Sequence, residues 1–147
     1  CRLDAAGIDC RRVELLGSDP QPEHLTKHSL VDLMLDPFPH AGGISAADAL
    51  WMGVPLVSLN GNIASGRVGA SALHAIDLDE LIANDTTEYV EIAVGLARSP
   101  GRLAELRASM RSRVLASSMG NAKRYVEAVE KVYSDIWRDW CEAQPRF

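Results

Sequence analysis

Residues 36–43 bring together residue types that readily hold an anion, directly before a helix expected to begin at Ile44. Two prolines prevent regular structure there, and Gly42 and Gly43 let a ligand approach the backbone closely. A helix amino terminus presents unpaired amide hydrogens and about half a positive charge, so phosphate is the ligand that it favours. The segment therefore predicts a phosphate-binding turn at the carboxyl end of a strand, where ligands of open parallel sheets gather.

Ser45 and Asp48 follow in this expected helix and offer polar groups to the same ligand. The Ser45 hydroxyl can donate to phosphate, and the Asp48 carboxylate can accept hydrogen bonds from ribose hydroxyls. The alternative is an ordinary glycine-rich turn in which both residues only cap the helix. Spacing alone leaves the two interpretations open, because the segment matches neither GxGxxG nor a Walker motif.

The four histidines do not have the spacing of a zinc site, since neither HExxH nor HxxEH occurs. His24 and His28 share a helix face without an evident third ligand, which favours a solvated face. His40 lies in the loop, where it either lines a ligand or closes the turn. Because a GxSxG elbow does not occur either, the sequence favours neither metal chemistry nor a hydrolase triad.

Residues 31–39 are also similar to the phospho-acceptor strand of response-regulator receiver domains, in which Asp36 would be the acceptor. A receiver needs an acidic pair after its first strand and a late Lys-Pro, and neither stands in order here. Three further helical stretches toward the C-terminus have no place in that fold. The receiver interpretation is therefore disfavoured.

Short apolar runs alternate with amphipathic stretches over the first two-thirds of the chain. This rhythm is typical of βαβ units and predicts an α/β fold, a Rossmann-like parallel sheet flanked by helices with a helical C-terminal tail. The expected strands are residues 13–16, 33–36 and 55–59. The expected helices are residues 22–30, 44–52, 67–75, 87–97, 103–115 and 122–140. Residues 1–147 are expected to form a single domain, with the long C-terminal helix over about residues 118–142.

The composition is that of a globular domain, with 47% hydrophobic and 24% charged residues in 147. A net charge of -5 provides no basic field for a polynucleotide, and the chain lacks the apolar run of about 20 residues that a membrane span needs. Cys1, Cys10 and Cys141 form neither an even framework nor a CxxC pair, which fits a reducing compartment. We expect a cytoplasmic fragment of a longer protein, with no nucleic-acid or membrane partner.

Residues 32–57 read DLMLDPFPHAGGISAADALWMGVPLV and strongly resemble the O-GlcNAc transferase/SPINDLY family. Residues 64–71, ASGRVGAS, are similar to the family's ASRVxAS run with Gly66 inserted or shifted. Further matches follow in order at residues 79–83 and in the final helix. The resemblance therefore covers about residues 13–140.

The resemblance implies a GT-B glycosyltransferase, in which two Rossmann-like halves face a cleft and the C-terminal half binds a nucleotide-sugar donor. This chain resembles that C-terminal half in bacterial TPR proteins. By the resemblance, residues 19–27 lie against the base, the turn at residues 43–45 binds the diphosphate, and Asp48 binds the ribose. His24 corresponds to a histidine that stacks on uracil, and Lys27 to an arginine of the animal enzymes. The implied nucleotide-sugar site consists of Asp19, Gln21, His24, Lys27, Gly42, Gly43, Ile44, Ser45 and Asp48, without a catalytic residue or a metal ligand.

Three differences from the family's pattern remove a polar side-chain contact, although many bacterial relatives also have glycine at the first of these positions, Gly43. Gly43 and Ile44 stand where the animal enzymes have His and Thr, so one imidazole and one hydroxyl contact to phosphate are lost. Gln21 replaces a lysine near the base. Each lost contact to a charged group is worth about 1.5–3 kcal/mol, and the backbone amides remain, so donor binding is expected to be weakened rather than lost.

The expected function is the donor-binding half of a protein O-glycosyltransferase that transfers GlcNAc from UDP-GlcNAc to Ser or Thr hydroxyls with inversion. No cofactor or metal is expected, because no DxD-type acidic pair is placed for one. The alternatives are a GDP-fucose-using SPINDLY-like transferase and a non-catalytic nucleotide-binding or scaffold module.

In the family, the acceptor-side residues, a phosphate-binding lysine and the TPR array precede the part represented here, so the chain alone is expected to be inactive. The last helix of GT-B proteins commonly crosses to the other half. The expected apolar face of this helix includes Tyr133, Ile136, Trp137 and Trp140.

Overall fold

A three-stranded parallel sheet lies at the centre of the computed structural model, which describes residues 2–143. The strand order is β1 (Met34–Leu35), β2 (Leu56–Leu59) and β3 (Ile82–Ala83). Strand β2 has a neighbouring strand on each side and helices on both faces, so its sequence is almost continuously apolar. The register sets Met34 opposite Leu56, Leu35 opposite Val57, Ser58 opposite Ile82 and Leu59 opposite Ala83.

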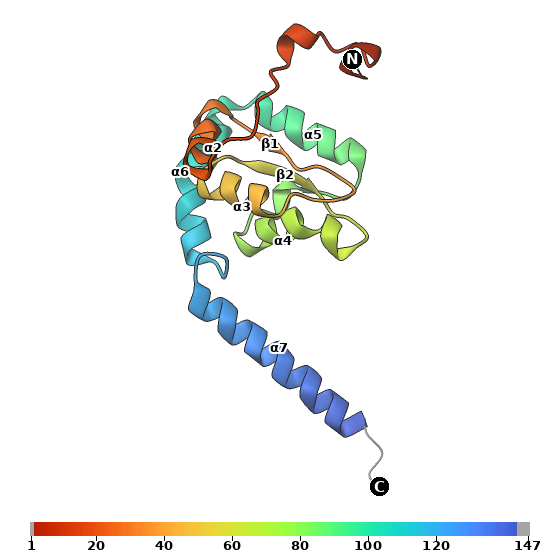
Figure 1. Cartoon of the computed structure of the whole chain (residues 1–147), viewed down its shortest axis with the longest axis vertical. Helices are drawn as coiled ribbons and strands as arrows, with labels where there is room; N and C mark the ends of the chain where they lie inside the picture. The colour runs from red at the N-terminus through yellow and green to blue at the C-terminus, as the bar shows by residue number, and fades with distance from the viewer. Residues whose placement is uncertain (1, 144–147) are drawn as a thin grey trace.

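Helices cover both faces of this sheet (Figure 1). Helices α3 (Ile44–Trp51) and α4 (Val68–Ala75) lie on one face, and α5 (Thr86–Ala97) lies on the other. Helix α6 (Pro100–Ala116) packs against both α3 and α5 and so ties the two layers together. The core lies between these layers and is lined by Leu50, Leu56, Val57, Leu73, Leu78, Leu106 and Met110.

Local signals account for the ends of these helices. After α3, Gly53 adopts a φ of 82°, a left-handed conformation that glycine accepts at low cost. Asp85 caps α5, because its Oδ1 accepts the amide hydrogens of Thr87 and Glu88 at 2.8 and 2.9 Å. A proline opens α6, where its missing amide hydrogen costs nothing.

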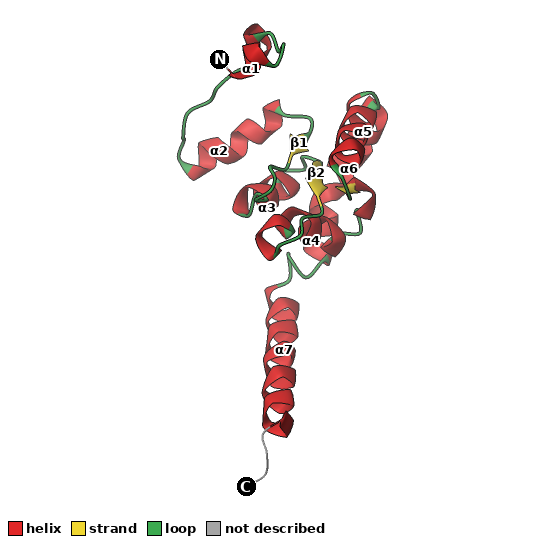
Figure 2. Cartoon of the chain, turned by 90° about the vertical axis from the view of Figure 1, so that its right-hand side faces the viewer, coloured by secondary structure: helices red, strands yellow, loops and turns green. Residues whose placement is uncertain are grey.

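The N-terminal region contains two short helices, α1 (Arg2–Ala5) and α2 (Gln21–Lys27). In Figure 2, α1 lies apart from the body, whereas α2 lies beside α3 in both views. Single 3-10 turns occur at Cys10–Arg12, His28–Leu30, Ala64–Gly66 and Asp79–Leu81.

The long helix α7 (Ala122–Ala143) extends away from the body in both views (Figures 1 and 2). It follows a tight turn in which the Ser117 hydroxyl donates to the Val114 carbonyl at 2.7 Å and accepts the Met119 amide hydrogen at 3.1 Å. A Cβ atom at Gly120 would lie 2.3 Å from that same carbonyl oxygen. None of the residues of α7 is buried, and its exposed apolar face consists of Tyr125, Val126, Val132, Tyr133, Ile136, Trp137 and Trp140.

The predicted α/β fold is confirmed, and the expected strands at residues 33–36 and 55–59 correspond to β1 and β2. The expected helices correspond to α2–α7, with ends that shift by a few residues. The predicted strand at residues 13–16 is wrong, because the described part of the chain places no strand beside this segment to share a hydrogen-bond ladder. Strand β3 was not predicted, because its two residues are too few to show a pattern.

No helix in the described part of the chain is both long and apolar enough to span a lipid bilayer. Cys10 and Cys141 are free thiols, and Cys1 lies outside the described residues.

Candidate functional site

Helix α3 begins at the predicted position, with Gly43 as its N-cap residue. Its first backbone hydrogen bond runs from the Ala47 amide to the Gly43 carbonyl, at 3.3 Å. The amide hydrogens of Ile44, Ser45 and Ala46 therefore point out of the amino-terminal end of the helix. Such a helix start favours a negatively charged ligand.

Ser45 and Asp48 do not cap α3, so the structure contradicts the capping interpretation. Among residues 2–143, neither the Ser45 hydroxyl nor the Asp48 carboxylate has a hydrogen-bond partner. Ser45 is exposed and Asp48 half-buried. Both polar groups thus remain available to a ligand at the start of α3.

The loop that leads into α3 is fixed by Asp36, whose side chain is only 1% exposed. Its Oδ1 accepts the Gly42 amide hydrogen at 2.8 Å, and its Oδ2 accepts the Ser58 hydroxyl hydrogen at 2.6 Å. The Asp36 amide donates to the Val57 carbonyl at 2.9 Å and so continues the ladder between β1 and β2. A phospho-acceptor must reach solvent, so the receiver interpretation of Asp36 is wrong.

Two more elements close around Asp36. The Tyr89 hydroxyl of α5 donates to the Asp36 carbonyl at 2.8 Å, and its ring meets Phe38 edge to face, with the centroids 5.5 Å apart. Burial raises the pKa of Tyr89, and the nearby charge of Asp36 raises it further. On the side of α4, a Cβ atom at Gly69 would lie 2.0 Å from Asp36 Oδ2, so only glycine leaves room for the carboxylate.

A second loop, residues 60–67, lies against the first at the same edge of the sheet. The Ala41 amide donates to the Ser65 carbonyl at 3.0 Å, which joins the two loops. Arg67 stiffens the second loop, because its Nε donates to the Gly61 carbonyl at 2.6 Å. His40, whose role the sequence left open, is exposed in the first loop.

The residues expected to contact the base lie around α2. Asp19, His24 and Lys27 line a pocket of about 420 Å³, all of whose lining comes from residues 14–31. Lys27 and Asp19 form an ion pair, with both side chains about two-thirds buried. The rings of His24 and His28 meet edge to face, with centroids 5.1 Å apart. Gln21 is exposed and does not line this pocket.

In the structure, eight of the nine predicted site residues thus fall into two separate groups. Gly42, Gly43, Ile44, Ser45 and Asp48 gather at the start of α3, whereas Asp19, His24 and Lys27 gather at α2. The pocket at α2 has no lining residue from the turn at α3, so the two groups do not share one cavity in this chain.

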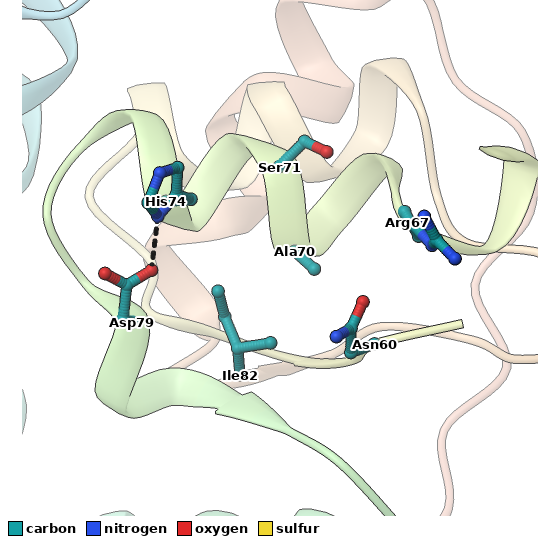
Figure 3. Close-up of a pocket in the computed structure, with 7 residues that line it drawn as sticks. All are labelled: Asn60, Arg67, Ala70, Ser71, His74, Asp79 and Ile82. Carbon is teal, nitrogen blue, oxygen red and sulfur yellow. Dashed lines mark hydrogen bonds and ion pairs between the residues drawn. The ribbon is translucent and has the colours of Figure 1, made fainter. Parts of the chain in front are cut away.

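Another pocket, of about 350 Å³, runs along α4 and contains none of the predicted residues (Figure 3). At one end, His74 Nδ1 lies 2.7 Å from Asp79 Oδ1, and Arg67 lies at the other end. The hydrogen bond with Asp79, and then its charge, raise the pKa of His74. The His74 and Arg67 side chains are thus already partnered within the protein. No group of three His, Cys, Asp or Glu side chains within residues 2–143 could hold a metal ion.

The connection between Asp36, Ser58, Gly69 and Tyr89 was not predicted from the sequence. These residues come from four elements, so no local spacing joins them. The only available signal was an aspartate at the end of an apolar strand, and it suggested a phospho-acceptor instead.

Comparison with known proteins agrees with this architecture. A family model described as Glycosyl transferase family 41 matches residues 2–129. A structure of an O-GlcNAc transferase mutant from Thermobaculum terrenum superposes with a TM-score of 0.87 at 36% sequence identity, over 95% of this chain and 27% of that one. The fold, including its long C-terminal helix, is thus that of an O-GlcNAc transferase region.

The chain belongs to glycosyl transferase family 41. A tomato (Solanum lycopersicum) relative, named "Probable UDP-N-acetylglucosamine--peptide N-acetylglucosaminyltransferase SPINDLY", is 34% identical over 141 residues, 95% of this chain and 15% of its own length. The Caenorhabditis elegans "UDP-N-acetylglucosamine--peptide N-acetylglucosaminyltransferase" is 30% identical over 139 residues, 95% of this chain and 12% of its own length. The chain therefore spans only about a seventh of such relatives.

Proposed function

We propose that this chain is the donor-binding half of a protein O-glycosyltransferase and that the start of α3 holds the diphosphate of UDP-GlcNAc. The observation that carries the proposal is a helix start with unpartnered Ser45 and Asp48 in a chain of glycosyl transferase family 41. The names of the tomato and nematode relatives, which include UDP-N-acetylglucosamine, support this donor.

In the proposed reaction, the hydroxyl of an acceptor Ser or Thr attacks the anomeric carbon of the sugar. The bond from that carbon to the diphosphate oxygen breaks, the configuration inverts, and UDP leaves with the electron pair. The amides and dipole of α3 stabilise the charge that develops on the leaving diphosphate, with the Ser45 hydroxyl as a further donor. The proton of the acceptor hydroxyl passes to a base on the acceptor side, which is proposed to lie in the rest of the longer protein.

The base and the ribose have separate roles in the proposed site. The exposed ring of His24 offers a face on which uracil can stack, and the ion pair between Lys27 and Asp19 borders the same pocket. Asp48 accepts hydrogen bonds from the ribose hydroxyls. Because the chain spans about a seventh of its relatives, the other half, the acceptor site and the TPR array are proposed to lie in the rest of a longer bacterial-type protein.

A calorimetric titration of this chain with UDP, GDP and ADP tests the donor site. We expect UDP to bind most tightly and Asp48→Ala to weaken it about tenfold or more, because a hydrogen bond to a charged group is worth about 1.5–3 kcal/mol. Asp139→Ala is the matched control, since this exposed carboxylate lies on α7. Equal affinity of the Asp48→Ala variant and the unmodified chain would refute the ribose assignment.

One observation favours a second candidate, a non-catalytic nucleotide-binding or scaffold module. The Ile44 side chain is 79% exposed at the helix start, where it gives an anion no donor. A longer protein that binds UDP but transfers no sugar from UDP-GlcNAc would support this alternative. Tighter binding of GDP than of UDP would instead favour the GDP-fucose-using SPINDLY-like transferase.

A further inference from the structure

We infer that Asp36 is a positioning residue for the diphosphate site, because its buried carboxylate holds the loop before α3 in the conformation that presents the helix amides to the ligand. This inference rests on the proposed function of the α3 turn. Asp36 itself does not touch the ligand in this scheme and acts through Gly42 and Ser45.

The Asp36 carboxylate connects the loop before α3 to the central strand. One oxygen accepts the Gly42 amide hydrogen at 2.8 Å, and the other accepts the Ser58 hydroxyl hydrogen at 2.6 Å from the central strand. The loop is therefore bonded through a single side chain to the most buried strand of the sheet. Since Gly42 lies two residues before Ile44, its amide fixes the direction in which the chain enters α3.

The position of Gly42 also affects Ser45. A Cβ atom at Gly42 would lie 2.8 Å from Ser45 Oγ and 3.1 Å from Asp36 Oδ1. The Ser45 hydroxyl thus packs against the backbone that Asp36 holds, so a shift of Gly42 also displaces this donor. Both the amides and the hydroxyl of the proposed phosphate site thus follow from the backbone that Asp36 holds at Gly42, beside the separate tie between the Ala41 amide and the Ser65 carbonyl.

The burial of Asp36 has a cost. Asp36 is 1% exposed, and no ion pair among residues 2–143 includes it, so its charge is buried without a cation. Burying a carboxylate in this way is costly, and an apolar side chain would fill the space more cheaply. Such a side chain could accept neither the Gly42 amide hydrogen nor the Ser58 hydroxyl hydrogen, so the carboxylate is what links the loop to the central strand.

The test compares UDP with uridine, which lacks the phosphates but keeps the base and the ribose. We expect Asp36→Ala to reduce the preference of the chain for UDP over uridine about tenfold, the equivalent of one lost hydrogen bond to a charged group. Asp36→Asn should retain the preference, because its amide oxygen can accept from Gly42 and its NH2 group can donate to the Ser58 oxygen. Asp36→Leu fills the same space without a hydrogen-bond acceptor, so it should also lose the preference for UDP over uridine. If Asp36→Ala does not fold, Asp36→Leu still tests the role of the carboxylate.

Asp85→Ala is the matched control, since Asp85 also holds backbone amides but caps α5. Asp85→Ala should lower the melting temperature and leave the ratio of the affinities for UDP and uridine unchanged. Exchange of the Gly42 amide hydrogen, followed without ligand by NMR, should be faster in Asp36→Leu than in Asp36→Asn.

The outcomes separate the two proposals. If the unmodified chain does not prefer UDP to uridine, the function proposed for the α3 turn fails, and the role of Asp36 fails with it. If the unmodified chain prefers UDP and both Asp36→Ala and Asp36→Leu retain that preference, only the positioning role is overturned.

Discussion

His74 and Asp79 form an exposed pair whose stabilising effect depends on pH. The hydrogen bond with Asp79 raises the pKa of His74, and the charges of Asp79 and Asp77 raise it further. The stabilisation from this pair is fully present below the pKa of an unfolded histidine, about 6.5, and is lost as pH rises through the higher pKa of the folded state. Because both side chains are exposed, solvent screens the pair and its effect on stability is small.

We expect an NMR titration of the His74 ring to give a pKa above the ordinary value. Asp79→Asn should move the pKa of His74 back toward that value, because the amide removes the negative charge. Glu105→Gln is the control, because it removes an exposed carboxylate that pairs with Arg102 and should leave the pKa of His74 unchanged. An unchanged His74 titration in the variant would contradict the pairing.

At the scale of elements, α6 determines how the two layers of the body fit together. Leu106 and Met110 lie at 1% and 0% exposure in the core, whereas Leu115 of the same helix is 53% exposed. Arg113 of α6 binds neighbouring backbone, because it donates to the carbonyls of Ile76 and Asp77, each at 3.1 Å. Helix α6 thus contributes apolar packing on one side and hydrogen bonds to the end of α4 on the other.

Leu106→Ala should lower the free energy of unfolding by about 2–5 kcal/mol, because it removes buried methyl groups and leaves a cavity. Leu115→Ala makes the same change on an exposed part of the helix and should cost less than about 1 kcal/mol. Urea denaturation followed by circular dichroism measures both values. Similar losses in the two variants would contradict the packing described for α6.

Elements were predictable where a pattern extends over several residues. The 3-to-4-residue spacing in α7 and the Gly53 stop after α3 predicted their elements within a few residues. Residues 13–16 have the apolar character of a strand, but a strand also needs a neighbour, and no short segment of sequence encodes one. The loop before α3 was predictable from its prolines and glycines, whereas its anchor was not, because Asp36 meets partners 22 and 53 residues away.

At the scale of the whole molecule, α7 stands apart from the cooperative body. None of its residues is buried, although its apolar face includes three aromatic side chains beyond residue 132, namely Tyr133, Trp137 and Trp140. The core that stabilises the fold lies between residues 46 and 114. The stability of the body should therefore be independent of α7.

We expect a chain that ends at Asn121 to melt within about 2 °C of the full chain, because the deletion removes no buried residue. A chain that ends at Arg98 also loses Leu106 and Met110 and should not fold cooperatively. Differential scanning calorimetry compares the three chains. A large fall in the melting temperature after removal of α7 alone would show that the helix contributes to the core.

The turn between α6 and α7 makes the long helix a lever. With 22 residues at a rise of 1.5 Å, α7 is about 33 Å long, so a rotation of about 10° at its base moves its far end by about 6 Å. The two hydrogen bonds of the Ser117 hydroxyl and the close packing of Gly120 on the Val114 carbonyl set that angle. A displacement of a few tenths of an ångström within this turn is thus amplified into a shift of several ångströms at the tip.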